Sequence, residues 1–247
     1  MTGIKLKLGE ELIVADWRWI IRNMVLREET KLHERGVRSR LQQICGNIFW
    51  DIGANVGFYS FWLRKNFKKV VAVEPNPQTA YALRKRIKFC LARNIEVKQV
   101  ALSDDRGWTT LYSKREWVAT VGIGNLLAGI GNRCSSDSLL PRFDYKSSRE
   151  PSGRLDKVRE NRPGLQVWTE RFDDVNTGLV DLVKIDVEGA EFLVLDGMRN
   201  SLRDHLVKRL VVELHNREDR TRLESLLMGY SYAIEWLDPE HLFAKVL

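Results

Sequence analysis

The 247-residue sequence has few cysteines and no long apolar run. Cys45, Cys90 and Cys134 are widely spaced, form no CxxC pair and have no histidine placed to complete a zinc site. This pattern excludes a cysteine-based zinc site and predicts reduced thiols in an intracellular protein. No window approaches the roughly 20 apolar residues of a membrane span, and the first residues lack the pattern of a secretory signal. We therefore expect a cytoplasmic protein without a transmembrane segment.

Acidic residues are outnumbered by basic ones, with 33 Asp and Glu against 40 Lys and Arg, which gives a net charge of +7. A basic excess attracts anionic partners such as phosphorylated substrates, nucleic acid or an acidic membrane surface. A solvated basic face explains the same excess, and we prefer that interpretation slightly. The 44% hydrophobic content is sufficient for one substantial core, as in a single α/β domain of this length.

Apolar periodicity predicts strands and helices that alternate along most of the chain. The predicted strands are 48–52, 69–74, 96–102, 106–112, 165–169, 180–186, 209–214, 232–236 and 242–246. The predicted helices are 58–66, 77–92, 190–202 and 220–228. A βαβαβ run implies parallel strands, and the last two strands resemble an antiparallel hairpin. The predicted fold class is α/β, with a mostly parallel sheet.

Two regions fall outside this alternation. Residues 1–46 are predicted to be a helical extension, with apolar positions at mixed helical spacing among basic residues from Leu12 to Gln43. Residues 113–164 form an irregular insertion, in which the glycines between 121 and 137 are typical of a lid or, equally, of a surface loop. We expect residues 47–247 to form the main domain.

The turn DIGANVG, Asp51 to Gly57, follows the first strand of the main domain. Gly53 permits a sharp turn, and Gly57 lets the next helix approach the strand. The spacing DxGxxxG lacks the middle glycine that brings backbone against a pyrophosphate, so it favours a nucleotide cofactor without one. The acid Asp51 suits a cofactor with an ammonium group, as the methionyl end of S-adenosylmethionine has.

Further candidate cofactor residues follow the next two strands. Glu74 ends a strand about twenty residues beyond the turn, where a carboxylate can accept from both ribose hydroxyls. Asn76 follows it, although we favour a capping role there because Pro77 suits a first helical turn. Ser103 and Asp104 follow the third strand, and Asp104 could accept from an adenine amino group or cap a turn.

Charged residues also crowd the ends of two later apolar strands. VDLVKIDVEGAE supplies Lys184, Asp186 and Glu188, and RLVVELHN supplies Glu213 and His215. Parallel strands would bring these side chains to one sheet edge, where open α/β sheets place their sites. They could form an acceptor site or bind a divalent cation such as magnesium. A structural explanation is an ion pair for Lys184 and stabilisation of a helix N-terminus by Glu188 and Glu191.

Taken together, FWDIGANVGFYS, VVAVEPNP, ALSD, VDLVKIDVEGAEFLVLDGM and LVVELH resemble the FkbM family of S-adenosylmethionine-dependent methyltransferases. The resemblance spans residues 48–215 and implies a Rossmann-like class I fold, a seven-stranded sheet with an antiparallel final hairpin, and methyl transfer to a hydroxyl oxygen. It places Asp51, Gly53, Asn55 and Gly57 around the methionyl group. It places Glu74 at the ribose, Ser103 and Asp104 at the adenine, and Asp186 and Glu188 at the transferred methyl.

We expect the acceptor to be a small molecule or a glycan. The alternative is a nucleic acid, RNA ribose or base, held by basic stretches such as residues 83–88. The acceptor proton would pass to Asp186, Glu188 or His215, or magnesium on Asp186 and Glu213 would activate the acceptor with help from Lys184. A non-catalytic binding protein is disfavoured by the presence of Asp51, Glu74 and Asp186.

Overall fold

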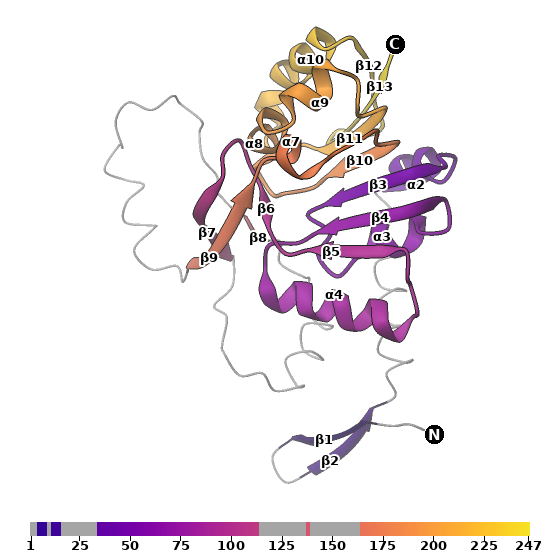
Figure 1. Ribbon diagram of the computed structural model, residues 1–247, viewed down its shortest axis with the longest axis vertical. Coiled ribbons are helices and arrows are strands. Elements are labelled where there is room, and N and C mark those ends of the chain that lie inside the picture. The colour runs from indigo at the N-terminus through magenta and orange to yellow at the C-terminus, as the bar shows by residue number, and fades with distance from the viewer. Residues whose placement is uncertain (1–3, 9–10, 16–33, 114–136, 139–163) are drawn as a thin grey trace.

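The computed structural model describes residues 4–8, 11–15, 34–113, 137–138 and 164–247 (Figure 1). Near the N-terminus, β1 (Ile4–Leu8) pairs antiparallel with β2 (Glu11–Ala15). The helical prediction for residues 1–46 is therefore wrong for 4–8 and 11–15, which form strands. It is confirmed further on by α2 (Arg35–Leu41), whose Val37 and Leu41 are fully buried one helical turn apart.

The core of the protein is a seven-stranded sheet in the order β12-β13-β11-β10-β3-β4-β5. Its strands are β3 (Gly46–Ile52), β4 (Phe67–Val73), β5 (Ile95–Lys98), β10 (Leu182–Ile185), β11 (Arg209–Glu213), β12 (Tyr232–Trp236) and β13 (His241–Val246). The five strands from β11 to β5 pair in parallel, whereas β13 is antiparallel to both β11 and β12. The predicted mostly parallel sheet with an antiparallel terminal hairpin is confirmed.

Helices cover both faces of this sheet, which gives three layers (Figure 1). One face packs on α2, α3 (Phe58–Leu63) and α4 (Pro77–Phe89) through an apolar cluster that includes Phe49, Leu83 and Val211. The other face packs on α7 (Phe172–Val175), α8 (Glu191–Asp196), α9 (Arg199–Arg203) and α10 (Arg220–Gly229), the last preceded by the 3₁₀ turn η2 (Arg217–Asp219). Successive residues of the inner strands alternate between the two faces, and both faces are apolar, as expected of parallel strands buried on each side.

A second sheet has the order β6-β9-β7-β8. Its strands are β6 (Ala101–Leu102), β7 (Gly107–Ser113), β8 (Asp137–Ser138) and β9 (Gly164–Glu170). The strand predicted over 96–102 is thus divided between two sheets, as β5 and β6. Leu111 and Val167 of the second sheet pack with Ala190 and Leu193, which lie just beyond the carboxyl end of β10.

Two more predictions differ from the structure or fall outside it. The helix predicted over 190–202 is interrupted between α8 and α9, where Gly197 packs so closely that an added Cβ would lie 2.1 Å from the Ser103 carbonyl oxygen. Most of the predicted insertion, residues 114–136 and 139–163, lies outside the described residues, as does the greater part of the glycine-containing lid candidate. Among the described helices, none is long and apolar enough to cross a membrane.

Candidate active site

The turn Asp51–Gly57, which we call the cofactor turn, leaves the carboxyl end of β3 where the strand order reverses toward β4 on one side and β10 on the other. Gly53, Asn55 and Gly57 all have positive φ, of 80°, 50° and 82°. Gly53 also lacks room for a side chain, because a Cβ there would lie 1.8 Å from the carbonyl oxygen of Asp186. Crevices at such a reversal are the usual ligand sites of open α/β sheets.

Asp51 is the buried acid at the first position of this turn. Its Oδ2 accepts a hydrogen bond from the Ser60 amide at 2.9 Å and another from the Ser60 hydroxyl. Burial raises the pKa of Asp51, while Lys184 and the Ser60 bonds oppose that shift. Asp51 therefore connects α3 to the sheet, and contact with a cofactor ammonium group stays a prediction.

Glu74 lies beside the turn, at the end of β4. Its Oε2 accepts from the Asn55 amide and its Oε1 from the Asn76 amide, both at 2.9 Å. The Asn76 side chain in turn accepts from the amides of Gln78 and Thr79 at the start of α4, as the capping interpretation expects. The carboxylate is thus fixed in orientation, and its contact with the ribose hydroxyls stays a prediction.

Ser103 and Asp104 follow β6 in the second sheet. The Ser103 hydroxyl donates to Asp104 Oδ1 at 3.0 Å, and the Ser103 amide donates to the Glu170 carbonyl. Ser103 is buried, whereas Asp104 is exposed. Their predicted contacts with an adenine ring stay predictions.

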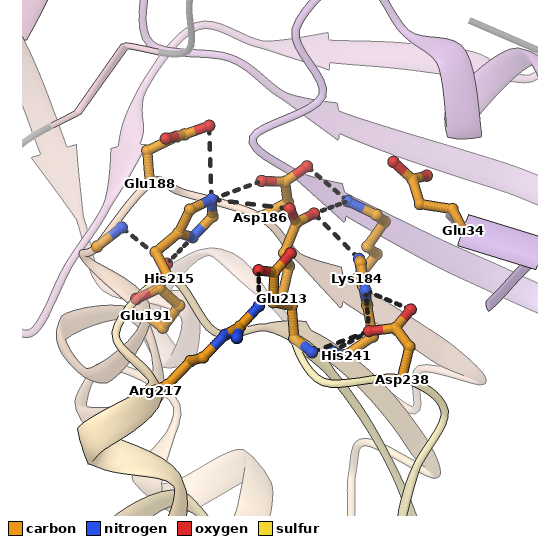
Figure 2. Close-up of polar contacts among 12 residues, drawn as sticks. Glu34, Lys184, Asp186, Glu188, Glu191, Glu213, His215, Arg217, Asp238 and His241 are labelled. Atoms are coloured by element: carbon orange, nitrogen blue, oxygen red, sulfur yellow. Dashed lines mark hydrogen bonds and ion pairs between the residues drawn. The ribbon is translucent and has the colours of Figure 1, made fainter. Parts of the chain in front are cut away.

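The five candidate residues of the later strands, Lys184, Asp186, Glu188, Glu213 and His215, do lie together, and we call them the acceptor cluster (Figure 2). Register explains their meeting: Lys184 is the partner of Asp51 in β3 and of Val211 in β11, two residues before Glu213. Asp186 continues from β10 and donates its amide to the Ile52 carbonyl at 3.0 Å. The cluster is therefore adjacent to the cofactor turn.

Lys184 is the buried cation of the cluster, with a relative exposure of 1%. Its Nζ lies 2.8 Å from Asp186 Oδ2, 4.0 Å from Glu213 Oε2 and 4.6 Å from the centroid of the Tyr59 ring. Burial favours the neutral amine, but Asp186, Glu213 and Asp51 outweigh it and raise the pKa of Lys184. The same ion pair outweighs the burial of Asp186 and lowers the pKa of that carboxyl.

His215 is surrounded by four carboxylates. Its Nδ1 lies 2.8 Å from Glu191 Oε1, and its Nε2 lies 3.5 Å from Glu188, 3.7 Å from Glu213 and 3.9 Å from Asp186. Burial favours the neutral ring, but the bonds to Glu188 and Glu191 outweigh it and raise the pKa of His215 to about 11. The imidazole is therefore protonated at neutral pH in this arrangement.

The structure brings three further residues to the acceptor cluster that the sequence analysis did not place there. Glu191, interpreted above only as a helix-terminal acid, is buried and accepts from both His215 and the Gly189 amide. His241 lies opposite Glu213 in the β11–β13 ladder, with its Nε2 3.2 Å from Glu213 Oε2. Asp238 contacts His241 Nδ1 at 2.9 Å. Burial lowers the pKa of His241, but Glu213 and Asp238 outweigh burial and raise it.

A further pair approaches Lys184 from the N-terminal side. The Tyr59 hydroxyl donates to Glu34 Oε2 at 2.5 Å, and both residues are buried.

A signal for His241 was present in the sequence, because the first residue of an antiparallel strand lies at the edge where its parallel neighbours end. No local pattern indicated Glu34.

A divalent cation would find donors of two kinds in the acceptor cluster. One ligand atom each from Asp186, Glu188 and His215 lies within 4.8 Å of the other two. Such a mixed carboxylate and imidazole set suits transition metals better than magnesium, which prefers oxygen ligands. The ring of His215 would have to lose its proton to bind a metal.

The sheet order, the terminal hairpin and the glycine turn at the strand reversal together define a Rossmann-like methyltransferase fold. A family model described as the methyltransferase FkbM domain matches residues 51–241, so this chain belongs to the FkbM methyltransferase family. The match begins at Asp51 and ends at His241, and it includes every candidate site residue named from the sequence.

Relatives agree with this assignment. Methyltransferase 1 of Beauveria bassiana is 23% identical over 205 residues, which cover 77% of this chain and 76% of that protein. The AMB antimetabolite synthetase AmbE of Pseudomonas aeruginosa is 27% identical over 190 residues, which cover 70% of this chain but only 8% of the synthetase. A crystal structure of methyltransferase FkbM from Methylobacillus flagellatus superposes with a TM-score of 0.52 at 15% identity, and covers 81% of this chain and 43% of that one.

Proposed function

We propose that this protein transfers the methyl group of S-adenosylmethionine to a hydroxyl oxygen of a small molecule or glycan. The observation that carries the proposal is the direct contact between the cofactor turn and the acceptor cluster: the backbone of Gly53 packs against the Asp186 carbonyl. A cofactor held by Asp51, Gly53, Asn55, Gly57 and Glu74 would present its methyl group beside Asp186 and Glu188. Ser103 and Asp104 would contact the adenine.

Methyl transfer from a sulfonium is an in-line displacement, so positioning of the acceptor oxygen supplies much of the acceleration. An alcohol must also lose its proton, and a nearby base assists that step. His215 is already protonated in this arrangement, which favours a carboxylate as the proton acceptor. Of the two candidates we favour Glu188, because Asp186 is bound directly to Lys184, which lowers the pKa of Asp186.

Two measurements test this proposal. Titration calorimetry with S-adenosylmethionine should show binding that Glu74→Ala abolishes, since Glu74 would accept from the ribose. Absence of binding by the folded wild-type protein would defeat the proposal. Glu188→Gln should then lower the rate of labelled-methyl transfer by about 100-fold, the usual contribution of a general base, while cofactor affinity is unchanged.

A metal-assisted version of the same reaction would use a divalent cation on Asp186, with Glu213 or with Glu188 and His215 as further ligands. The ion would lower the pKa of the acceptor hydroxyl, and Lys184 would stabilise the developing alkoxide. Exhaustive chelation should then abolish transfer, and added Mn²⁺ should restore it. Undiminished transfer after chelation would reject this version.

A nucleic-acid acceptor is the alternative, and the outer face of α4 favours it. Arg84, Lys85 and Lys88 are exposed there, and Lys85 lies 5.1 Å from the centroid of the exposed Tyr81 ring. The segment 75–95 contains no acidic residue. Backbone phosphates would bind such a face in a salt-dependent manner. RNA binding that weakens with salt, and that Lys85→Glu with Lys88→Glu removes, would promote this alternative above the small-molecule acceptor.

A further inference from the structure

The carboxylate of Glu213 is the central anion of the acceptor cluster. Its Oε2 lies 3.2 Å from His241 Nε2 and 4.0 Å from Lys184 Nζ, and its Oε1 lies 3.7 Å from His215 Nε2. Lys184 and His241 are almost completely buried, whereas the Glu213 side chain is 21% exposed. Oε2 therefore faces two buried side chains, Lys184 and His241, and Oε1 faces His215.

His241 is fixed by the hairpin that carries it. Both carboxylate oxygens of Asp238 lie 2.9 Å from His241 Nδ1. Asp238 Oδ1 also accepts hydrogen bonds from the amides of Glu240 and His241, each at 2.9 Å. A carboxylate that holds one ring nitrogen fixes the orientation of the ring and directs the other nitrogen at its target. Here Nε2 lies 3.2 Å from Glu213 Oε2, at ion-pair distance but outside hydrogen-bond geometry.

The contact between the Asp238 carboxylate and the His241 ring is not needed to form the turn between β12 and β13. The amide bonds to Asp238 Oδ1 already close the turn between β12 and β13, and the Leu237 amide donates to the His241 carbonyl. An apolar side chain would fill position 241 equally well, as Leu242 and Phe243 fill the next two positions of β13. Removing an imidazole from water costs free energy, so the burial of His241 beside Glu213 of the acceptor cluster calls for a functional explanation.

We propose that His241, fixed by Asp238, is a positioning residue of the acceptor site: it holds Glu213 with one oxygen toward Lys184 and the other toward His215. This rests on the proposed function only in naming the site an acceptor site. The terminal antiparallel hairpin thereby contributes to the chemistry, because β13 delivers a side chain to the edge at which the parallel strands end.

The first test does not depend on methyl transfer. In protein labelled with ¹⁵N-histidine, Glu213→Gln should shift the Nε2 resonance of His241, which His241→Gln identifies among the four histidines. A crystal structure of His241→Leu should show the Glu213 carboxylate rotated away from Lys184. An unshifted resonance, or an unmoved Glu213 in His241→Leu, would overturn the proposal even if the protein binds S-adenosylmethionine.

The second test is kinetic, with tritiated-methyl S-adenosylmethionine and a fractionated extract of the source cells as the acceptor pool. His241→Leu should lower the initial rate by about 10- to 100-fold, the usual cost of losing an orienting partner. His241→Gln, whose amide can still donate to Glu213, should recover most of that rate. The double variant Glu213→Gln with His241→Leu should be no slower than Glu213→Gln alone, because His241 acts through Glu213.

Matched controls separate positioning from folding. His205→Leu removes a histidine at the amino-terminal edge of the parallel strands, where Nε2 contacts the Tyr230 carbonyl and the ring packs edge-on against Tyr232, and should leave the rate unchanged. Calorimetric affinity for S-adenosylmethionine should be the same in His241→Leu and the wild type. Multiplicative losses in the double variant, or a His241→Gln variant as slow as His241→Leu while fully folded, would refute a positioning role.

Discussion

The cofactor turn with Glu74 and the acceptor cluster both contain acids, but the acids are buried in the first and partly exposed in the second, and they are held differently. In the cofactor turn, Asp51 binds the amide and hydroxyl of Ser60, nine residues away, and beside the turn Glu74 binds two backbone amides. In the acceptor cluster, side chains bind side chains: Lys184, His215 and His241 face acids of β11, of α8 and of the segment that follows β10. Backbone amides cannot titrate or rotate away, whereas side-chain pairs respond to pH, substitution and ligand. The first arrangement suits a constant cofactor, and the second suits a reacting group.

We expect the largest loss of stability and of cofactor binding from Gly53→Ala, which disrupts the contact between the cofactor turn and Asp186. The new Cβ would lie 1.8 Å from the Asp186 carbonyl oxygen, at a residue with φ of 80°. The backbone conformation alone costs about 1–3 kcal/mol, and the overlap must also displace β3 or β10. Denaturant unfolding should show the loss, and calorimetry should show no S-adenosylmethionine binding. Gly178→Ala has no heavy atom within 4 Å of the added Cβ, so it should change the unfolding free energy and the S-adenosylmethionine affinity little.

Removing the buried cation should affect the acceptor cluster more than the cofactor turn. Lys184→Met leaves Asp186 and Glu213 without their common partner, and loss of one member of a buried pair costs about 3–5 kcal/mol. Asp186, whose pKa Lys184 lowers, should take up a proton more readily in the variant, so the variant should regain part of its stability as pH falls from 7 to 5. Unfolding curves at several pH values measure this. A variant as stable as the wild type at pH 7 would contradict the assigned role of Lys184.

The pH dependence of stability should identify His215. Its pKa is raised from 6.5 to about 11 in the folded protein, so protonated His215 stabilises the fold fully below pH 6.5. That contribution should decline as pH rises from 6.5 and be lost near 11. His215→Gln should therefore flatten the curve of unfolding free energy against pH over this window, and His205→Gln should not. Parallel curves for His215→Gln and the wild type would show that the imidazole is neutral.

We expect the smallest loss of unfolding free energy from a substitution at Asn76, which lies beside the cofactor turn. Asn76→Ala removes the side chain that caps α4 and should cost about 1 kcal/mol of unfolding free energy. If Asn76 only caps, the affinity for S-adenosylmethionine should hardly change, and Asn76→Asp should restore stability. A large loss of affinity in both variants would instead make Asn76 a cofactor residue, as its place beside Glu74 also allows.

Most of the fold could be predicted because its signals are local. Apolar runs of strand length alternate with amphipathic helices, and the penultimate strand, 232–236, was predicted with the observed bounds. The failures came where tertiary packing decides: the close approach of Gly197 to Ser103 accompanies the break between α8 and α9, and the predicted strand over 96–102 was divided between two sheets. Periodicity alone carries no information about such contacts.

The sequence by itself determined the cofactor turn, because its glycines, Asp51 and Glu74 lie within 24 residues and their roles follow from backbone geometry. It also supplied the five residues of the acceptor cluster, as charges at the ends of apolar strands. Only the tertiary structure decided which of them pair, that four carboxylates surround His215, and that Glu191, Asp238 and His241 join them. The reason is physical: the charge state of a buried side chain depends on every neighbour within a few ångströms, and here those neighbours come from strands far apart in the chain.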